Sequence, residues 1–348
     1  MSDLGDVLAL WRKAGTNRDP FILATIVAVE GSSYRRPGAR MIITASGERA
    51  GTISGGCLEA EVSKKSAWLV KEGPVVAPFK TDFDLDDEVP SGSGCGGTIH
   101  LLLEPGHSAN ALLEQLDRAW ERRTGLGVAT VIDGPDTGQR QIASDIEPSP
   151  STQTDLSELA EYALRNRVGT IRSTSRGKVV LEYVPPRRAI YIFGAGDDAL
   201  PLVTYAGVLG WYVVVMDGRS NLARQERFPK ADQVRVLSDA LLPDLDIKSH
   251  DAVVLMTHSY EQDLRALRMV VPIRPAYLGM LGPRVRSEHL VRRITSELKL
   301  DFDATMNDIH APLGLDIGRD HAAVIALAGI AQIQGAFNQD SFQTTICR

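Results

Sequence analysis

The chain has 348 residues, of which 43% are hydrophobic and 24% are charged, a balance typical of soluble globular proteins. A formal net charge of −6 argues against a nucleic-acid partner. No apolar stretch is long enough to span a bilayer, and no basic segment followed by an apolar core opens the chain, so we expect neither a membrane segment nor a secretory signal. Three cysteines without a Cys-x-x-Cys pair favour a reducing, cytoplasmic setting.

The first half of the chain mixes short strands with helices of different lengths. In chain order we expect an amphipathic helix over 3–14, strands over 21–29 and 39–44, a helix from about 57 to 70, a strand over 98–103, a helix over 109–121, and strands over 128–132 and 179–184. Gly73-Pro74 ends the second helix. This order predicts an α+β domain over residues 1–184.

The second half of the chain alternates strands and helices regularly after a proline- and arginine-rich linker at 185–188. Strands are expected over 189–193, 212–216, 234–237, 252–256 and 276–278, with helices after the first strand and over 261–269, 285–298 and 321–334. Such alternation predicts a parallel sheet with helices on both faces, so we expect a Rossmann-like domain over residues 185–348.

The turn after the first strand of this second half carries the motif Gly-Ala-Gly-Asp-Asp-Ala at 194–199. The elements here have the order of a dinucleotide-binding unit: a strand, Gly-x-Gly-x-x-Ala, a helix, a second strand and an acidic residue. In such a unit Gly194 makes the turn, Gly196 allows close approach of the ligand, and Asp217 holds the ribose hydroxyls. Arg219 is close enough in sequence to contact an added phosphate.

Three features of this half leave its ligand open. Asp197 and Asp198 stand at the helix start, where their charges compete with a pyrophosphate for the same amides. The glycines would also be needed in a Rossmann domain that serves only as a scaffold. His258 follows a predicted strand at the edge where open α/β sheets bind ligands. It could act as an acid or base or contact a ligand. Alternatively, it is a loop histidine with a backbone partner.

Two cysteines of the first half lie in glycine clusters. In Ser54-Gly55-Gly56-Cys57-Leu58-Glu59, Ser54 is a plausible N-cap, which places Cys57 in the first helical turn, where the helix dipole favours anions and a thiolate. Glu59 in that turn would stabilise the dipole or serve a bound group by hydrogen bonding or proton transfer. The second cluster, Gly94-Cys95-Gly96-Gly97, enters a strand, and its glycines allow backbone amides to approach a ligand.

Together the two clusters offer soft sulfur ligands and an anion cradle. Cys57 and Cys95 would then suit a thiophilic metal that bears a phosphate-containing organic group. The alternative is that both cysteines are small buried hydrophobes beside tight turns. Zinc fits less well, because Cys57, Cys95, His100 and His107 lack the close pair spacing of structural zinc sites.

Taken in order, the motifs resemble those of the XdhC/CoxI family, accessory proteins for molybdenum hydroxylases such as xanthine dehydrogenase. The resemblance covers about 21–103 and 188–330. It rests on GSSYRRPGARM at 31–41, GGCLE at 55–59, GCGG at 94–97, GAG at 194–196, DGR at 217–219, TH at 257–258, YLGMLG at 277–282 and PLGLDIG at 312–318.

The resemblance implies a protein that binds the molybdenum cofactor (molybdopterin), protects it during sulfur addition, and delivers it to an apo molybdenum hydroxylase. Cys57 and Cys95 match the family's Gly-Cys positions, so the cofactor-contact set in this domain becomes Gly55, Gly56, Cys57, Glu59, Cys95 and Gly96, with the two sulfurs as metal ligands. A cleft between the domains is the expected site. The sulfur-adding step allows for a cysteine desulfurase as a partner, and the resemblance implies a homo-oligomer such as a dimer.

The chain departs from the family where Asp197 follows Gly-x-Gly, a position at which the family commonly has histidine. NAD(P) or another nucleotide at this turn, contacted by Gly194, Gly196, Asp217, Arg219 and His258, therefore stays open. The resemblance favours a cofactor-binding chaperone over a turnover enzyme. The alternative is an NAD(P)-dependent oxidoreductase that uses Cys57 or His258.

Overall fold

The structure is a computed structural model that describes residues 2–80, 97–145, 154–237 and 245–339. The chain divides between Arg187 and Arg188 into two compact units, called unit 1 and unit 2 below. Cys95 and Gly96 lie outside the described residues. Among the helices within the described ranges, none combines the length and apolar character needed to cross a bilayer.

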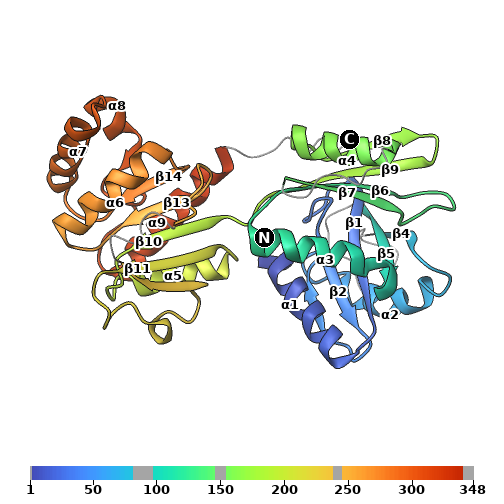
Figure 1. Cartoon of the computed structure of the whole chain (residues 1–348). Helices are drawn as coiled ribbons and strands as arrows, with labels where there is room; N and C mark the ends of the chain where they lie inside the picture. The colour runs from blue at the N-terminus through green and yellow to red at the C-terminus, as the bar shows by residue number, and fades with distance from the viewer. Residues whose placement is uncertain (1, 81–96, 146–153, 238–244, 340–348) are drawn as a thin grey trace. The chain divides into compact units, whose positions relative to one another are not determined.

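Unit 1 is built on two antiparallel sheets (Figure 1). The five-stranded sheet has the order β3-β2-β1-β5-β4, and the four-stranded sheet has the order β7-β6-β9-β8. The elements are α1 (Ser2–Asn17), β1 (Phe21–Gly31), β2 (Arg40–Thr44), β3 (Arg49–Gly51), α2 (Glu59–Leu69), β4 (Val75–Lys80), β5 (Gly97–Pro105), α3 (Gly106–Arg122), β6 (Leu126–Val131), β7 (Arg140–Ser144), α4 (Asp155–Asn166), β8 (Thr170–Thr174) and β9 (Gly177–Val184).

The central strands of the five-stranded sheet are buried on both faces, and each face has its own core. Leu23 and Ile42 pack with the apolar sides of α1 and α3, whereas Ile26 and Met41 pack with Val62 of α2. Side chains alternate between the faces of a strand, which explains how β1 serves both cores. The contact through Val62 fixes the start of α2, and with it the preceding loop, against the sheet.

Two buried ion pairs join the two sheets of unit 1. Arg40 on β2 donates to both carboxylate oxygens of Glu182 on β9, with N–O distances of 2.8 and 2.5 Å. Arg140 on β7 pairs with the buried Glu104 on β5. A bidentate arginine–carboxylate pair is geometrically specific, so the Arg40–Glu182 contact helps to set how the sheets face each other.

Unit 2 has a six-stranded sheet with the order β12-β11-β10-β13-β14-β15, in which every pair of neighbours is parallel. The strand order reverses between β10 and β13, the place where doubly wound sheets open a crevice. The elements are β10 (Ala189–Phe193), α5 (Ala199–Val208), β11 (Tyr212–Asp217), the 3₁₀ turn η1 (Gln225–Arg227), β12 (Gln233–Val236), β13 (Ala252–Leu255), α6 (Tyr260–Ile273), β14 (Tyr277–Met280), α7 (Arg284–Leu298), α8 (Phe302–Asn307), β15 (Ile309–His310) and α9 (Ala322–Gln339).

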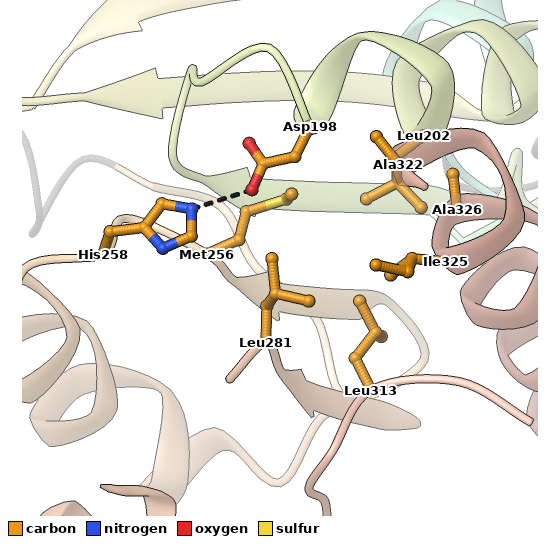
Figure 2. Close-up of a pocket in the computed structure, with 9 residues that line it drawn as sticks. All are labelled: Asp198, Leu202, Met256, His258, Leu281, Leu313, Ala322, Ile325 and Ala326. Atoms are coloured by element: carbon orange, nitrogen blue, oxygen red, sulfur yellow. Dashed lines mark hydrogen bonds and ion pairs between the residues drawn. The ribbon is translucent and has the colours of Figure 1, made fainter. Parts of the chain in front are cut away.

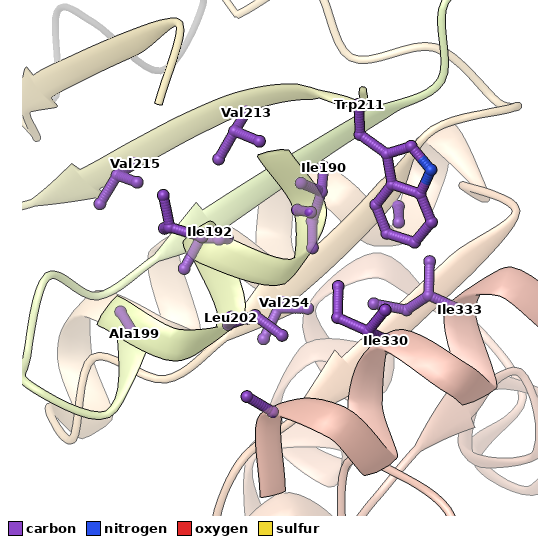
Figure 3. Close-up of a cluster of buried hydrophobic side chains, with 14 of the residues drawn as sticks. Ile190, Ile192, Ala199, Leu202, Trp211, Val213, Val215, Val254, Ile330 and Ile333 are labelled. Atoms are coloured by element: carbon purple, nitrogen blue, oxygen red, sulfur yellow. The ribbon is translucent and has the colours of Figure 1, made fainter. Parts of the chain in front are cut away.

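Helices cover both faces of this sheet. Ile190 and Ile192 of β10 pack with Leu202 of α5 and with Ile330 and Ile333 of α9 (Figure 3). The alternate residues of β10 point to the opposite face and join a second core with α6 and α7. The predicted fold class, an α+β domain followed by a Rossmann-like domain with a parallel sheet, is confirmed.

Some elements differ from the sequence prediction. Strands β3, β4, β7, β8 and β15 and helices α4 and α8 were not predicted. Strands β4, β7 and β8 each form an edge of a sheet or carry half-exposed side chains, so their apolar pattern is weak. Helix α2 begins at Glu59 rather than near Cys57.

Candidate functional site

The loop that carries Cys57 in unit 1 is held from inside by Glu59, whose side chain is only 7% exposed. One carboxylate oxygen accepts from the amides of Ile53 (3.1 Å) and Ser54 (2.9 Å). The other accepts from the Ser54 hydroxyl (2.5 Å) and from the Gly56 amide (3.0 Å). The first residue of α2 therefore folds the preceding loop around its own carboxylate.

These hydrogen bonds keep Glu59 charged. Burial opposes ionisation, but the donors from Ser54 and Ile53 outweigh burial and lower the pKa of the carboxyl below its ordinary value. A carboxylate that accepts four hydrogen bonds inside its own loop is already well partnered. In this structure Glu59 positions the loop.

Cys57 is a free cysteine with an exposed side chain. The alternative that it is a buried packing residue is therefore wrong. The N-cap prediction is also wrong: the helix is capped at Leu58 with no side-chain bond, because the Ser54 hydroxyl is bonded to Glu59 and to the Leu58 amide. Cys57 precedes the helix.

Tyr34 stands beside this loop, with 73% of its surface exposed. A Cβ placed on Gly55 would lie 3.5 Å from the Tyr34 ring, so ring and loop are in van der Waals contact. Gly55 and Gly56 have φ values of +150° and +117°, which side-chain-bearing residues rarely adopt. Tyr34 lay inside a sequence motif, but nothing in the pattern distinguished it from an ordinary turn residue.

Gly97, the first described residue after Cys95 and Gly96, lies next to the turn that carries Tyr34. Gly97 pairs with Gly31 across β5 and β1, and a Cβ on Gly97 would come within 2.2 Å of the Ser32 carbonyl oxygen. The predicted meeting of the two Gly-Cys loops involves residues that are not described, so it stays a prediction. Within the described part of the chain, no three His, Cys, Asp or Glu side chains form a potential metal site.

In unit 2 the Gly-x-Gly turn has the backbone of a Rossmann turn. Gly194 has a φ of +129°, and a Cβ there would lie 2.3 Å from the Met256 carbonyl oxygen. Only glycine fits this close approach of β10 and β13. The next amide, of Ala195, donates to Asp217 at the end of β11 with an N–O distance of 2.8 Å.

Asp217 is fully buried and pairs with Arg219. Its carboxylate accepts from the Arg219 amide (2.8 Å) and from the guanidinium (3.0 and 2.8 Å), in addition to Ala195. Burial opposes ionisation, but the hydrogen bonds from Arg219 and Ala195 outweigh it and lower the Asp217 pKa. The two residues predicted to contact a ribose and a phosphate are thus bound to each other.

The two remaining carboxylates of the turn are also paired. Asp197 accepts from Arg227 at 2.6 Å, and Arg227 also donates to the Ala195 carbonyl oxygen. Asp198 lies 2.8 Å from Nε2 of His258, which has an uncommon φ of +59° (Figure 2). His258 lies after β13, next to the Gly194 turn.

A cavity of about 260 Å³ opens between Asp198 and His258 on one side and apolar side chains on the other (Figure 2). It lies where the carboxyl ends of β10 and β13 diverge, the crevice that open α/β sheets use for ligands. Of the predicted unit 2 residues, His258 lines this cavity, whereas Gly194, Gly196, Asp217 and Arg219 do not, and Cys57 belongs to unit 1. The apolar lining consists of Leu202, Met256, Leu281, Leu313, Ala322, Ile325 and Ala326.

Comparison with known proteins gives matches in both units. The XdhC and CoxI family model matches residues 14–79, and the XdhC Rossmann domain model matches residues 190–333. A probable xanthine dehydrogenase subunit from Bacillus subtilis (strain 168) is 26% identical over 324 residues, 91% of this chain and 93% of that protein. The molybdenum cofactor insertion chaperone PaoD of Escherichia coli (strain K12) is 24% identical over 321 residues, 90% of this chain and 82% of PaoD.

A solved structure shares the same architecture. The crystal structure of a xanthine dehydrogenase from Bacillus halodurans matches with a TM-score of 0.76 and 26% identity over 97% of both chains. The two family models together cover more than half of the chain, one in each unit and in the order expected from the motifs. The chain therefore belongs to the XdhC and CoxI family.

Proposed function

We propose that this chain is an accessory protein that binds the molybdenum cofactor and delivers it to a molybdenum hydroxylase. Family membership and the similarity to a cofactor insertion chaperone support this role. The observation that carries the proposal is an exposed cysteine, Cys57, on a glycine loop fixed by Glu59 beside the exposed ring of Tyr34.

Each part of this loop suits such a cargo. The Cys57 sulfur is a soft donor for a thiophilic metal centre. The exposed face of Tyr34 can stack on a flat pterin ring, and Gly55 and Gly56 let the cargo approach the backbone closely. Cys95 would add a second sulfur. Gly97, two residues after Cys95, lies beside the turn that carries Tyr34.

The exposure of the loop also suits delivery. A protein that delivers a cofactor must release it to the acceptor enzyme. A cofactor bound at an exposed loop is accessible to that enzyme. Because Glu59 fixes the loop beforehand, little ordering of the backbone is needed when the cargo binds. The expected partner is an apo molybdenum hydroxylase.

The test is direct titration of the purified full chain with the molybdenum cofactor, followed by pterin fluorescence and bound molybdenum. We expect Cys57→Ser to weaken binding by about tenfold or more, which corresponds to about 1.4 kcal/mol. Glu61→Gln is the control, because Glu61 lies four residues after Cys57, in α2, and pairs at the surface with Lys65. Activation of an apo molybdenum hydroxylase by the loaded chain then tests delivery.

Two outcomes contradict the proposal. If the wild-type chain binds no cofactor, the chaperone role is wrong. If a Cys57→Ser, Cys95→Ser double variant binds as tightly as the wild type, the loop is not the site. Single variants at each cysteine show whether one sulfur or both contribute.

A further inference from the structure

We propose that the cavity of unit 2 is a second binding site, which takes a flat, uncharged nitrogen heterocycle at the Asp198 carboxylate instead of the pyrophosphate of a dinucleotide. The site belongs to unit 2 and does not depend on Cys57. It therefore goes beyond the loop of Gly55, Gly56 and Cys57 that is proposed above to bind the molybdenum cofactor, called the cargo loop here.

The first argument is the position of Asp198. A Cβ on Gly196 would lie 2.6 Å from the Asp198 carboxylate, so this carboxylate lies directly over the second glycine of the turn. In a dinucleotide-binding unit that glycine leaves room for the pyrophosphate. Here a carboxylate of the protein already lies over the glycine, and it would repel a phosphate.

The second argument is that the cations around the turn are committed to carboxylates. Arg219 is bound to Asp217 and Arg227 to Asp197. Arg286, which follows β14 at the same edge of the sheet, donates to the buried Asp263 at 2.7 Å. The Ala195 amide, which could otherwise face a phosphate, donates to Asp217. A pyrophosphate would have to displace one of these pairs.

The third argument is the chemistry of the cavity. Its walls are mostly aliphatic, and Asp198 with His258 provides the polar side. A volume of about 260 Å³ lies just below the range of about 300–1,000 Å³ for pockets of drug-sized ligands, which suits a single ring system. An apolar cavity with one polar edge suits a flat heterocycle.

Hydrogen bonding narrows the class of heterocycle. A carboxylate only accepts, and its two oxygens offer about four lone-pair sites, of which His258 faces one. Two adjacent N–H donors on a ring can bind such a group side by side, as a guanidinium does. Guanine presents that edge, an amino group next to a ring N–H. The His258 contact holds Asp198 at the edge of the cavity.

Calorimetry with the full chain tests this inference, with guanosine as the probe and inosine, ADP and NAD⁺ as comparisons. We expect guanosine to bind, and we expect inosine, which lacks the amino group, to bind at least about tenfold more weakly than guanosine. Asp198→Asn replaces one acceptor oxygen by a donor and should weaken probe binding by about tenfold or more. Asp197→Asn is the matched control, because Asp197 is 92% exposed and pairs with Arg227 outside the cavity.

A second variant keeps the test independent of Asp198. Ala322→Phe should fill the cavity and abolish probe binding, whereas Leu327→Phe, on the exposed side of the same helix, should not. The inference is overturned if no probe binds to folded protein. It is also overturned if ADP or NAD⁺ binds and Asp198→Asn strengthens that binding, because the turn would then be a pyrophosphate site. Guanosine carries no metal, so its binding to unit 2 and the binding of the molybdenum cofactor to the cargo loop are measured separately. Failure of one can therefore be told apart from failure of the other.

Discussion

The amide of Gly56 donates to Glu59 across 3.0 Å, and this bond fixes the residue that directly precedes the exposed Cys57. Glu59 is the first residue of α2, which Val62 anchors in the core of the five-stranded sheet. The Glu59 carboxylate thus links the glycine loop to the helix that packs on the sheet. A thiol on a loop that is already ordered binds a ligand with a smaller loss of conformational entropy than a thiol on a flexible loop. The loop was ordered when the protein folded.

Glu59→Gln should loosen this loop and destabilise unit 1. An amide offers one acceptor oxygen, and its NH₂ group would face the backbone donors that the carboxylate now satisfies. We expect a loss of about 1–3 kcal/mol in the free energy of unfolding, measured by urea denaturation. Glu61→Gln, which removes only a surface pair, should change it by less than about 0.5 kcal/mol. Equal effects of the two variants would contradict the role of Glu59.

The contribution of Glu59 should also depend on pH. Hydrogen bonds from Ser54 and Ile53 outweigh burial and hold its folded pKa below the ordinary value of 4.5. A depressed pKa stabilises the folded state above the unfolded pKa and loses that effect as the pH falls through the folded value. The stability difference between wild type and Glu59→Gln should therefore be full at pH 7 and shrink below pH 4.5. Urea midpoints of both proteins along a pH series measure it, and a difference that stays constant into acid would contradict this assignment.

The two glycines of the unit 2 turn should respond differently to alanine. Gly194→Ala puts a methyl group 2.3 Å from the Met256 carbonyl oxygen at a φ of +129°, and a backbone atom cannot move away without separating β10 from β13. We expect Gly194→Ala to cost about 3 kcal/mol or more, or to prevent folding. Thermal denaturation and soluble yield measure this effect.

Gly196→Ala is the informative partner of that variant. Its methyl group would meet the Asp198 carboxylate, the mobile end of a side chain that can swing away. We expect a folded protein with a smaller loss of stability and an Asp198 displaced from its place over the turn. If Gly196→Ala were as damaging as Gly194→Ala, the turn would not depend on the approach of Met256 as described.

The sequence was sufficient to predict the central sheet and most of the helices of unit 2, although β15 and α8 were missed. Its central strands are short, continuous apolar runs that end at a glycine or an acid, as parallel strands buried on both faces require. The carboxyl ends of parallel strands meet at one edge, so the turn at Gly194 and the residue His258 after another strand could be placed together without coordinates. The cavity between them follows from the reversal of strand order.

The pairing of side chains could not be predicted in the same way. Nothing in the spacing of Asp217 and Arg219 says that they bind each other, because that depends on how the chain turns after β11. Similarly, Glu59 looked like a first-turn acid that stabilises the helix dipole, and only the structure shows its carboxylate turned back into the loop. Periodicity reports which face of an element is buried, but it does not report which donor a buried acceptor finds.

Helix α9 offers a final test of how the cavity of unit 2 is built, because it supplies both cavity wall and core. Ile333 is fully buried against the sheet, whereas Leu327 on the same helix is 51% exposed. Ile333→Ala should lower the free energy of unfolding by about 2–5 kcal/mol through lost burial and the cavity left behind. Leu327→Ala should change it by less than about 0.5 kcal/mol, because little surface is removed from water at that position. Denaturant unfolding followed by circular dichroism measures both, and comparable losses would mean that α9 does not pack on the sheet through the Ile333 face.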